Sequence, residues 1–178
     1  MKAVYERSSA VTWEEFQKRK KRCMEELEEK IQLTKEIPGT HYFDMDILGV
    51  VRAWNRIPLT WTATTCSGTP NDHWPKDKWG TRFWNYEQVP PNGWLCANSY
   101  AADPGFEDFR QGLRQIEGID VCKDHLRDDE GYVGLHFHFI RFWVPEDIVK
   151  ENTDLLYLNR CWDKVEAFLK EFYDIHCH

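Results

Sequence analysis

The sequence predicts an α/β chain of the α+β type, a single domain over residues 1–178 with a mixed β-sheet covered by helices. Two observations support this prediction. Segments with apolar residues at three- and four-residue spacings stand near both ends, and short segments rich in β-branched and aromatic residues lie between them. The length of 178 residues suits one domain with one core, because domains usually contain about 100–200 residues.

The first predicted helix begins after Thr12 and ends before the turn signal Pro38-Gly39. Thr12 and Glu15 have the spacing of a capping box, in which each side chain bonds the backbone N–H of the other residue. Apolar residues then recur on one side of the helix: Trp13, Phe16, Cys23, Met24, Leu27 and Ile31. This pattern predicts an amphipathic helix.

A second helix is predicted between Asp44 or Asp46, either of which can cap it, and Pro58. Its apolar side consists of Ile47, Leu48, Val51 and Trp54. The next segment, 59–65 (LTWTATT), is short and rich in β-branched residues, so it predicts a strand. That strand runs into a turn at Cys66-Ser67-Gly68.

The remaining elements alternate strands and helices. They are predicted as strands at 81–87 and 93–100, a helix to about Glu117, strands at 119–122 and 132–143 around an acidic turn at 128–131, and a helix at 154–173. Pro104 suits the first position of the middle helix, and Gly118 suits its end. The strands at 119–122 and 132–143 are expected to pair like a hairpin.

The net charge of −7, from 23 basic and 30 acidic residues, does not favour a polyanionic partner, so nucleic-acid binding requires a local basic patch. Arg19, Lys20 and Lys21 offer one on the first helix, where they could meet tRNA phosphates. Glutamates flank this patch, so an alternative of at least equal weight is a solvated helix face with ion pairs between residues four positions apart.

The cellular setting expected from the sequence is the cytoplasm, with no membrane partner. No apolar run approaches the roughly 18–20 residues of a membrane span, and the first 21 residues lack the apolar region of a signal peptide. The six cysteines form no C-x-x-C pair, which favours reduced thiols over a disulfide framework or a zinc knuckle.

A hydroxyl-rich turn, Thr64–Gly68, is the segment with the most chemical groups. Gly68 can adopt positive φ and turn successive N–H groups toward one point, while Thr64, Thr65 and Ser67 add hydroxyls. Such a turn suits a carboxylate, a phosphate or a sugar. The alternative is a strand that simply ends in a tight turn, which is a common arrangement.

Several segments, taken in order, resemble the tRNA wybutosine-synthesising methyltransferase family, the third enzyme of that pathway. The resemblance rests mainly on the first 70 residues, on these segments: FQKRKK with Phe16, Asp44-Met45-Asp46-Ile47, Trp54-Asn55 and Thr62–Gly68. Gly93-Trp94-Leu95 and Leu135-His136 resemble two later strands of the family.

The resemblance implies S-adenosylmethionine as methyl donor and a wybutosine-precursor guanosine in tRNA-Phe as acceptor. It implies the following binding residues: Asn55, Thr64, Thr65, Cys66, Ser67, Gly68, Trp94 and His136. No catalytic residue is assigned, and Cys66 is expected to be a contact residue, because no local His or Lys favours its thiolate.

The sequence departs from the family pattern in three places. Thr69 stands where the family has Arg, Ala97-Asn98-Ser99 stands where it has S-H-D, and the C-terminal glycine segment has no counterpart in this chain. An arginine is a planar bidentate donor for carboxylate or phosphate, so its loss would change ligand binding. A non-catalytic relative that binds a small molecule in an aromatic cleft is therefore an alternative.

Aromatic residues make up 15% of the chain, more than a core of this size needs. Four tryptophans could stack on a flat base: Trp74, Trp79, Trp84 and Trp94. The alternative is that large rings pack the faces of the sheet, because aromatic residues favour strands.

His136 and His138 lie two residues apart, so a strand places both imidazoles on one face, opposite Leu135, Phe137 and Phe139. Two histidines on one face have good geometry for part of a metal site, which gives a second alternative, a metal-dependent hydrolase. No H-x-x-x-H or H-x-E element supports it. A polar, partly buried strand face is the simpler interpretation.

Overall fold

The computed structural model describes residues 11–37, 43–66, 92–127, 133–150 and 154–177. Its helices are α1 (Trp13–Glu36), the 3-10 turn η1 (Met45–Ile47), α2 (Leu48–Arg56), α4 (Phe106–Gln115), α5 (Glu146–Lys150) and α6 (Asp154–His176). Its strands are β1 (Thr60–Cys66), β2 (Asn92–Tyr100), β3 (Ile119–Arg127) and β4 (Val133–Trp143).

The four strands form one sheet in the order β1-β2-β4-β3. Each pairing between neighbours is antiparallel, and the register places Ser99 opposite Thr60 on one side and His136 on the other. β1 has an irregularity between Thr62 and Thr64. Such a bulge bends its strand and increases the local twist.

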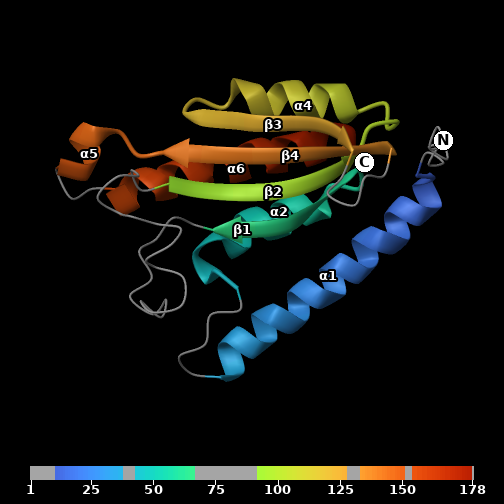
Figure 1. Ribbon diagram of the computed structural model, residues 1–178, viewed down its shortest axis with the longest axis horizontal. Helices are drawn as coiled ribbons and strands as arrows, with labels where there is room; N and C mark the ends of the chain where they lie inside the picture. Colours follow the sequence, from blue (N-terminus) through green and yellow to red (C-terminus); the bar gives the residue numbers. More distant parts are fainter. Residues whose placement is uncertain (1–10, 38–42, 67–91, 128–132, 151–153, 178) are drawn as a thin grey trace, which may run out of the picture.

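One face of the sheet packs against helices. Figure 1 shows α2 and α6 behind the sheet and α4 beside β3. The main core forms here from strand residues such as Leu95 and Ile140 and from helix residues such as Trp54, Phe109 and Leu169, each fully buried. The positions of these helices follow from their apolar stripes, which can be buried only against the sheet.

The other face is covered at one end only among the described elements. α1 lies beside β1, and its Phe16 joins Val11, Trp61 and Leu135 in a second, smaller buried cluster. Farther along α1, Ile31 belongs to the main core. The helix therefore bridges two apolar clusters.

Local sequence signals explain where several elements begin and end. Thr12 and Glu15 form the expected capping box, with Thr12 Oγ1 accepting from the Glu15 N–H at 3.2 Å and a Glu15 carboxylate oxygen accepting from the Thr12 N–H at 2.9 Å. Asp44 accepts from the Asp46 N–H at the start of η1. Gly118 has a φ of +82°, a conformation that favours glycine, in the turn between α4 and β3.

The predicted α/β fold class is confirmed, but every pairing between the described strands is antiparallel, whereas a mixed sheet was expected. The hairpin-like pair is β3 and β4. β3 and α6 extend farther than predicted, and α5 was not predicted. The strand expected at 81–87 and the turn at 128–131 lie outside the described residues.

The expected place of Pro104 inside a helix is wrong. α4 begins at Phe106 with Gly105 as its N-cap, because Asp103 Oδ1 accepts the Gly105 N–H at 2.8 Å and holds the preceding residues in a turn.

None of the helices in the described ranges is long and apolar enough to cross a membrane.

Candidate functional site

The end of β1 is the first part of the candidate site. Thr64, Thr65 and Cys66 are strand residues whose register partners on β2 are Cys96, Leu95 and Trp94. Thr65 is half-buried, while Ser67, Gly68 and Thr69 lie outside the described residues. The pairing places the start of the hydroxyl-rich turn beside Trp94, which sequence alone separates from it by 28 positions.

Asn55 holds β1 in place rather than reaching the turn. It is buried, its Oδ1 accepts the Thr62 N–H at 2.8 Å, and its Nδ2 donates to Thr62 Oγ1 at 2.9 Å. The two hydrogen bonds join the end of α2 to the middle of β1. Asn55 is therefore a positioning residue for the strand that leads into the turn.

The two histidines share a face, as predicted, but this face is the one that the helices cover. His136 and His138 are 3% and 1% exposed, and their ring centroids are 4.6 Å apart. Phe106 and Phe109 of α4 pack against them. Burial, and then the neighbouring His136, lower the pKa of His138 to about 3, so His138 is neutral near pH 7.

His138 and Ser99 resemble a base and its nucleophile, but their hydrogen-bond directions exclude that role. Thr60 Oγ1 donates to the Asn98 carbonyl (2.8 Å), so it accepts from Trp54 Nε1 (2.7 Å) and from Ser99 Oγ (2.9 Å). The Ser99 proton thus points to Thr60, and Ser99 Oγ accepts from His138 Nε2 at 3.0 Å. Ser99 is also fully buried, so this cluster supports the core.

The structure does not bring His136 to the hydroxyl-rich turn, although both were expected in one site. In the register, Trp94 stands opposite Arg141 and Ser99 opposite His136. His136 is thus five positions from Arg141 along β4, or about 17 Å at 3.3–3.4 Å per residue. Because five is odd, the two side chains also face opposite sides of the sheet.

A metal centre at the histidine pair finds no further ligands in the part of the chain that the structure describes. Among these residues no group of three or more His, Cys, Asp and Glu side chains could hold a metal ion. Four cysteines form no disulfide within the described residues: Cys23, Cys96, Cys161 and Cys177.

The basic patch on α1 is smaller than predicted. Lys20 was expected to meet phosphates, yet it is 6% exposed and its Nζ donates to the carbonyls of Ile57 and Pro58. Those carbonyls follow the last turn of α2, which attracts a cation. Lys21 is exposed, and its Nζ lies 3.9 Å from a carboxylate oxygen of Glu25. This is an ion pair between residues four apart, as the solvated-face alternative predicts.

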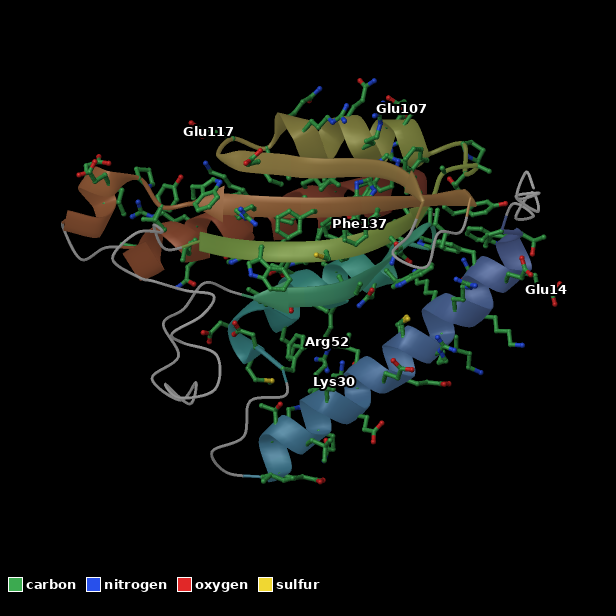
Figure 2. All side chains as sticks on the ribbon, in the orientation of Figure 1. Glu14, Lys30, Arg52, Glu107, Glu117 and Phe137 are labelled. Atoms are coloured by element: carbon green, nitrogen blue, oxygen red, sulfur yellow. The ribbon has the colours of Figure 1, made fainter. Side chains whose placement is uncertain are left out.

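The part of the sheet that no described helix covers presents an aromatic surface that we term the open face, lined by Trp94, Phe137, Phe139, Arg141 and Trp143, all half-buried. Figure 2 shows Phe137 in front of the sheet, on the side away from α6. The Trp94 and Phe139 rings stack with centroids 6.0 Å apart. The Arg141 guanidinium lies 4.7 Å from the ring centroids of both Phe139 and Trp143.

Sequence reasoning included Trp94 in the site but gave no role to the other four residues of the open face. The signal that could have found them is the alternation in β4, where Phe137, Phe139, Arg141 and Trp143 occupy every second position. An arginine within an aromatic row is unusual for a buried face. It indicates a surface in contact with solvent or a ligand.

A pocket of about 400 Å³ lies at the opposite end of the sheet from the hydroxyl-rich turn. Its lining includes Leu59 before β1, Asp103 and Asp108 near the start of α4, and Cys177 after α6. None of the residues implied by the resemblance lines it. It is therefore separate from the candidate site.

Comparison with known proteins finds no matching family model and no matching curated protein. Among solved structures, the PH1069 protein from Pyrococcus horikoshii is similar over 92% of this chain and 96% of its own, with a TM-score of 0.43 and 14% identity. A similarity of this size supports no conclusion about function.

Proposed function

We propose that this chain is an S-adenosylmethionine-dependent methyltransferase that acts in the cytoplasm on a wybutosine-precursor guanosine in tRNA-Phe. The observation that carries the proposal is the register of β1 on β2, which pairs Cys66 with Trp94 and Thr65 with Leu95. Two segments that separately resemble the family thereby become neighbours. The Asn55 hydrogen bonds to Thr62 give a third such segment a role in holding them together.

The residues at this end of the sheet fit S-adenosylmethionine in kind. The cofactor has a flat adenine ring and a polar amino-acid end. Trp94 supplies a half-buried ring on one face of the sheet. Thr65, which pairs with the buried Leu95, supplies a half-buried hydroxyl on the opposite face, at the end of the edge strand β1. Thr64, Cys66, Ser67 and Gly68 would complete the contacts, as the resemblance implies. When bound, S-adenosylmethionine supplies an activated methyl group on its sulfonium.

The task of this chain's own residues is then to hold and orient rather than to activate. The hydroxyl-rich turn binds the polar end of the cofactor, and the aromatic surface beside it holds the acceptor base and excludes water. Fixing two reactants in line removes much of the entropic barrier to transfer. Neither Ser99 nor His138 takes part, because both are buried on the other face.

Calorimetric titration of S-adenosylmethionine and S-adenosylhomocysteine tests the proposal, with and without tRNA-Phe. We expect saturable binding that Thr65→Val and Trp94→Leu weaken at least fivefold, because each removes a contact typically worth about 1 kcal/mol or more. Thr65→Ser, which keeps the hydroxyl, and Trp13→Leu, which changes a tryptophan on α1, are the matched controls.

The absence of binding heat in both conditions, with folded protein, would contradict the methyltransferase assignment. Equal weakening by Thr65→Val and Thr65→Ser would contradict the role of the hydroxyl. Binding of RNA without any cofactor binding would favour the non-catalytic relative.

A further inference from the structure

We propose that the open face is a stacking platform for at least two unpaired bases of a single-stranded RNA segment. This inference rests on the proposed function, because it names the form in which the RNA substrate is held. It adds Phe137, Phe139 and Arg141 of β4, and Asn98 of β2, to the residues that the resemblance implies. Its physical basis is the position of these side chains on the two central strands.

The first argument is the spacing of the rings. Phe137 and Phe139 are two residues apart on β4, so they lie about 6.7 Å apart on the same face. Trp94 from β2 stacks beside Phe139 with an interplanar angle of 30°. Successive rings in one surface can each receive a base, as aromatic residues on a sheet do when they bind single strands.

The second argument is the cation within the rings. Arg141 lies over the rings of Phe139 and Trp143, and its Nε has no hydrogen-bond partner among the described residues. A guanidinium on an aromatic surface suits a ligand that combines flat rings with phosphates. An apolar peptide would use the rings but would offer no anion to this cation.

The third argument is an acceptor beneath the platform. Asn98 stands opposite Phe137 on one side and Trp61 on the other, is 8% exposed, and its Oδ1 has no partner within the described ranges. A buried acceptor without a donor carries a desolvation cost of roughly 1–3 kcal/mol. That oxygen is enclosed in the structure, so the amino or imino group of a base stacked over Phe137 would satisfy it only after the Asn98 side chain turns toward the surface.

These features predict single-stranded rather than double-stranded RNA. In an A-form duplex the bases are already stacked, and the rings of a flat surface cannot reach their faces. Among the side chains that the structure describes on the open face, Arg141 supplies a positive charge, and Asp120 is close, accepting from Trp143 Nε1 at 3.4 Å. Affinity should therefore depend on stacking more than on phosphate neutralisation.

Fluorescence anisotropy with a labelled seven-nucleotide RNA of mixed sequence tests the proposal, with the blunt duplex of the same sequence as comparison. Phe137→Leu, which keeps an apolar side chain, should weaken binding about 5- to 150-fold, the range for one stacked base. The matched control Phe168→Leu removes a half-buried ring from α6 on the opposite side of the sheet and should leave affinity within twofold.

Arg141→Gln should reduce the salt dependence of single-strand binding. Loss of one phosphate contact changes the slope of log K against log salt by about 0.7. An unchanged slope would show that Arg141 contacts no phosphate of the RNA.

Three results would overturn the platform. The first is that the single strand does not bind at protein concentrations up to millimolar, with urea unfolding showing that the protein is folded. The second is that the duplex binds as tightly as the single strand. The third is that Phe137→Leu and Phe168→Leu change the affinity equally. A dimer that sedimentation detects and Phe137→Leu abolishes would assign the face to a second copy of the chain. Because the RNA measurement needs no cofactor, its failure is distinct from a failure of the S-adenosylmethionine titration.

Discussion

Thr60 is the residue on which the buried polar cluster depends. Its hydroxyl uses its hydrogen for the Asn98 carbonyl and both lone pairs for Trp54 and Ser99, so each donor and acceptor in the chain has a set direction. The low pKa of His138 follows from the same burial. A polar cluster inside an apolar core is stable only while all of its members remain satisfied.

Thr60→Val should therefore lower the free energy of unfolding by about 2–4 kcal/mol, because it leaves the donors of Trp54 and Ser99 without their acceptor in a dry site. Urea unfolding monitored by circular dichroism measures this change. Thr60→Ser keeps the hydroxyl and should remain within about 1 kcal/mol of the native chain. Similar losses in both variants would show that the methyl group, not the hydrogen bonds, is what matters.

At the scale of elements, two helical glycines differ in how closely other residues pack against them. Gly112 of α4 faces α6, where an added Cβ would lie 2.3 Å from a ring carbon of Phe168. Gly49 of α2 is exposed, and its added Cβ would meet only the Oε2 end of Glu166 at 2.8 Å. The first glycine allows a close helix approach, whereas the second does not require one.

Gly112→Ala should lower stability by about 1–2 kcal/mol, since the overpacking cost exceeds the roughly 1 kcal/mol that alanine adds to a helix. Gly49→Ala should be neutral or stabilising by up to about 1 kcal/mol, because a flexible carboxylate can move aside. Midpoints of urea unfolding for the two variants measure the contrast. The same sign for both would contradict the close packing of α4 on α6.

At the scale of the whole molecule, Lys20 joins α1 to the rest of the chain. Its Nζ bonds the carbonyls of Ile57 and Pro58, and burial lowers its pKa to about 8. The unfolded chain holds this proton up to about pH 10.5, so between the two values the unfolded state binds more protons. Stability should therefore rise with pH through this window.

We expect the free energy of unfolding to increase between pH 8 and pH 9, by at most about 1.4 kcal/mol per pH unit, and Lys20→Met to abolish the increase. The range stops at pH 9 because burial raises the pKa of the Cys161 and Cys177 thiols, which reverses the slope above it. Urea unfolding at several pH values measures the slope. A slope that survives in Lys20→Met would refute the assignment, and the control Lys21→Met should keep the slope of the native chain.

Signals within a few residues of one another were enough to predict much of this protein. The Thr12–Glu15 capping box, the apolar stripes of α1, α2 and α6, and the alternation that puts His136 and His138 on one face are all set by neighbours less than two helical turns away. The pairing of β3 with β4 also spans a short stretch of chain. Such features need no distant partner to be recognised.

Contacts between distant residues decided the rest. Lys20 meets carbonyls 37 and 38 positions away, Cys66 pairs with a tryptophan across the sheet, and the two histidines lie under α4 rather than in a cleft. No local pattern states whether a lysine is solvated or which face of a strand a helix will cover. These outcomes depend on which elements the apolar stripes pack against, because the burial of apolar surface is determined by the whole chain.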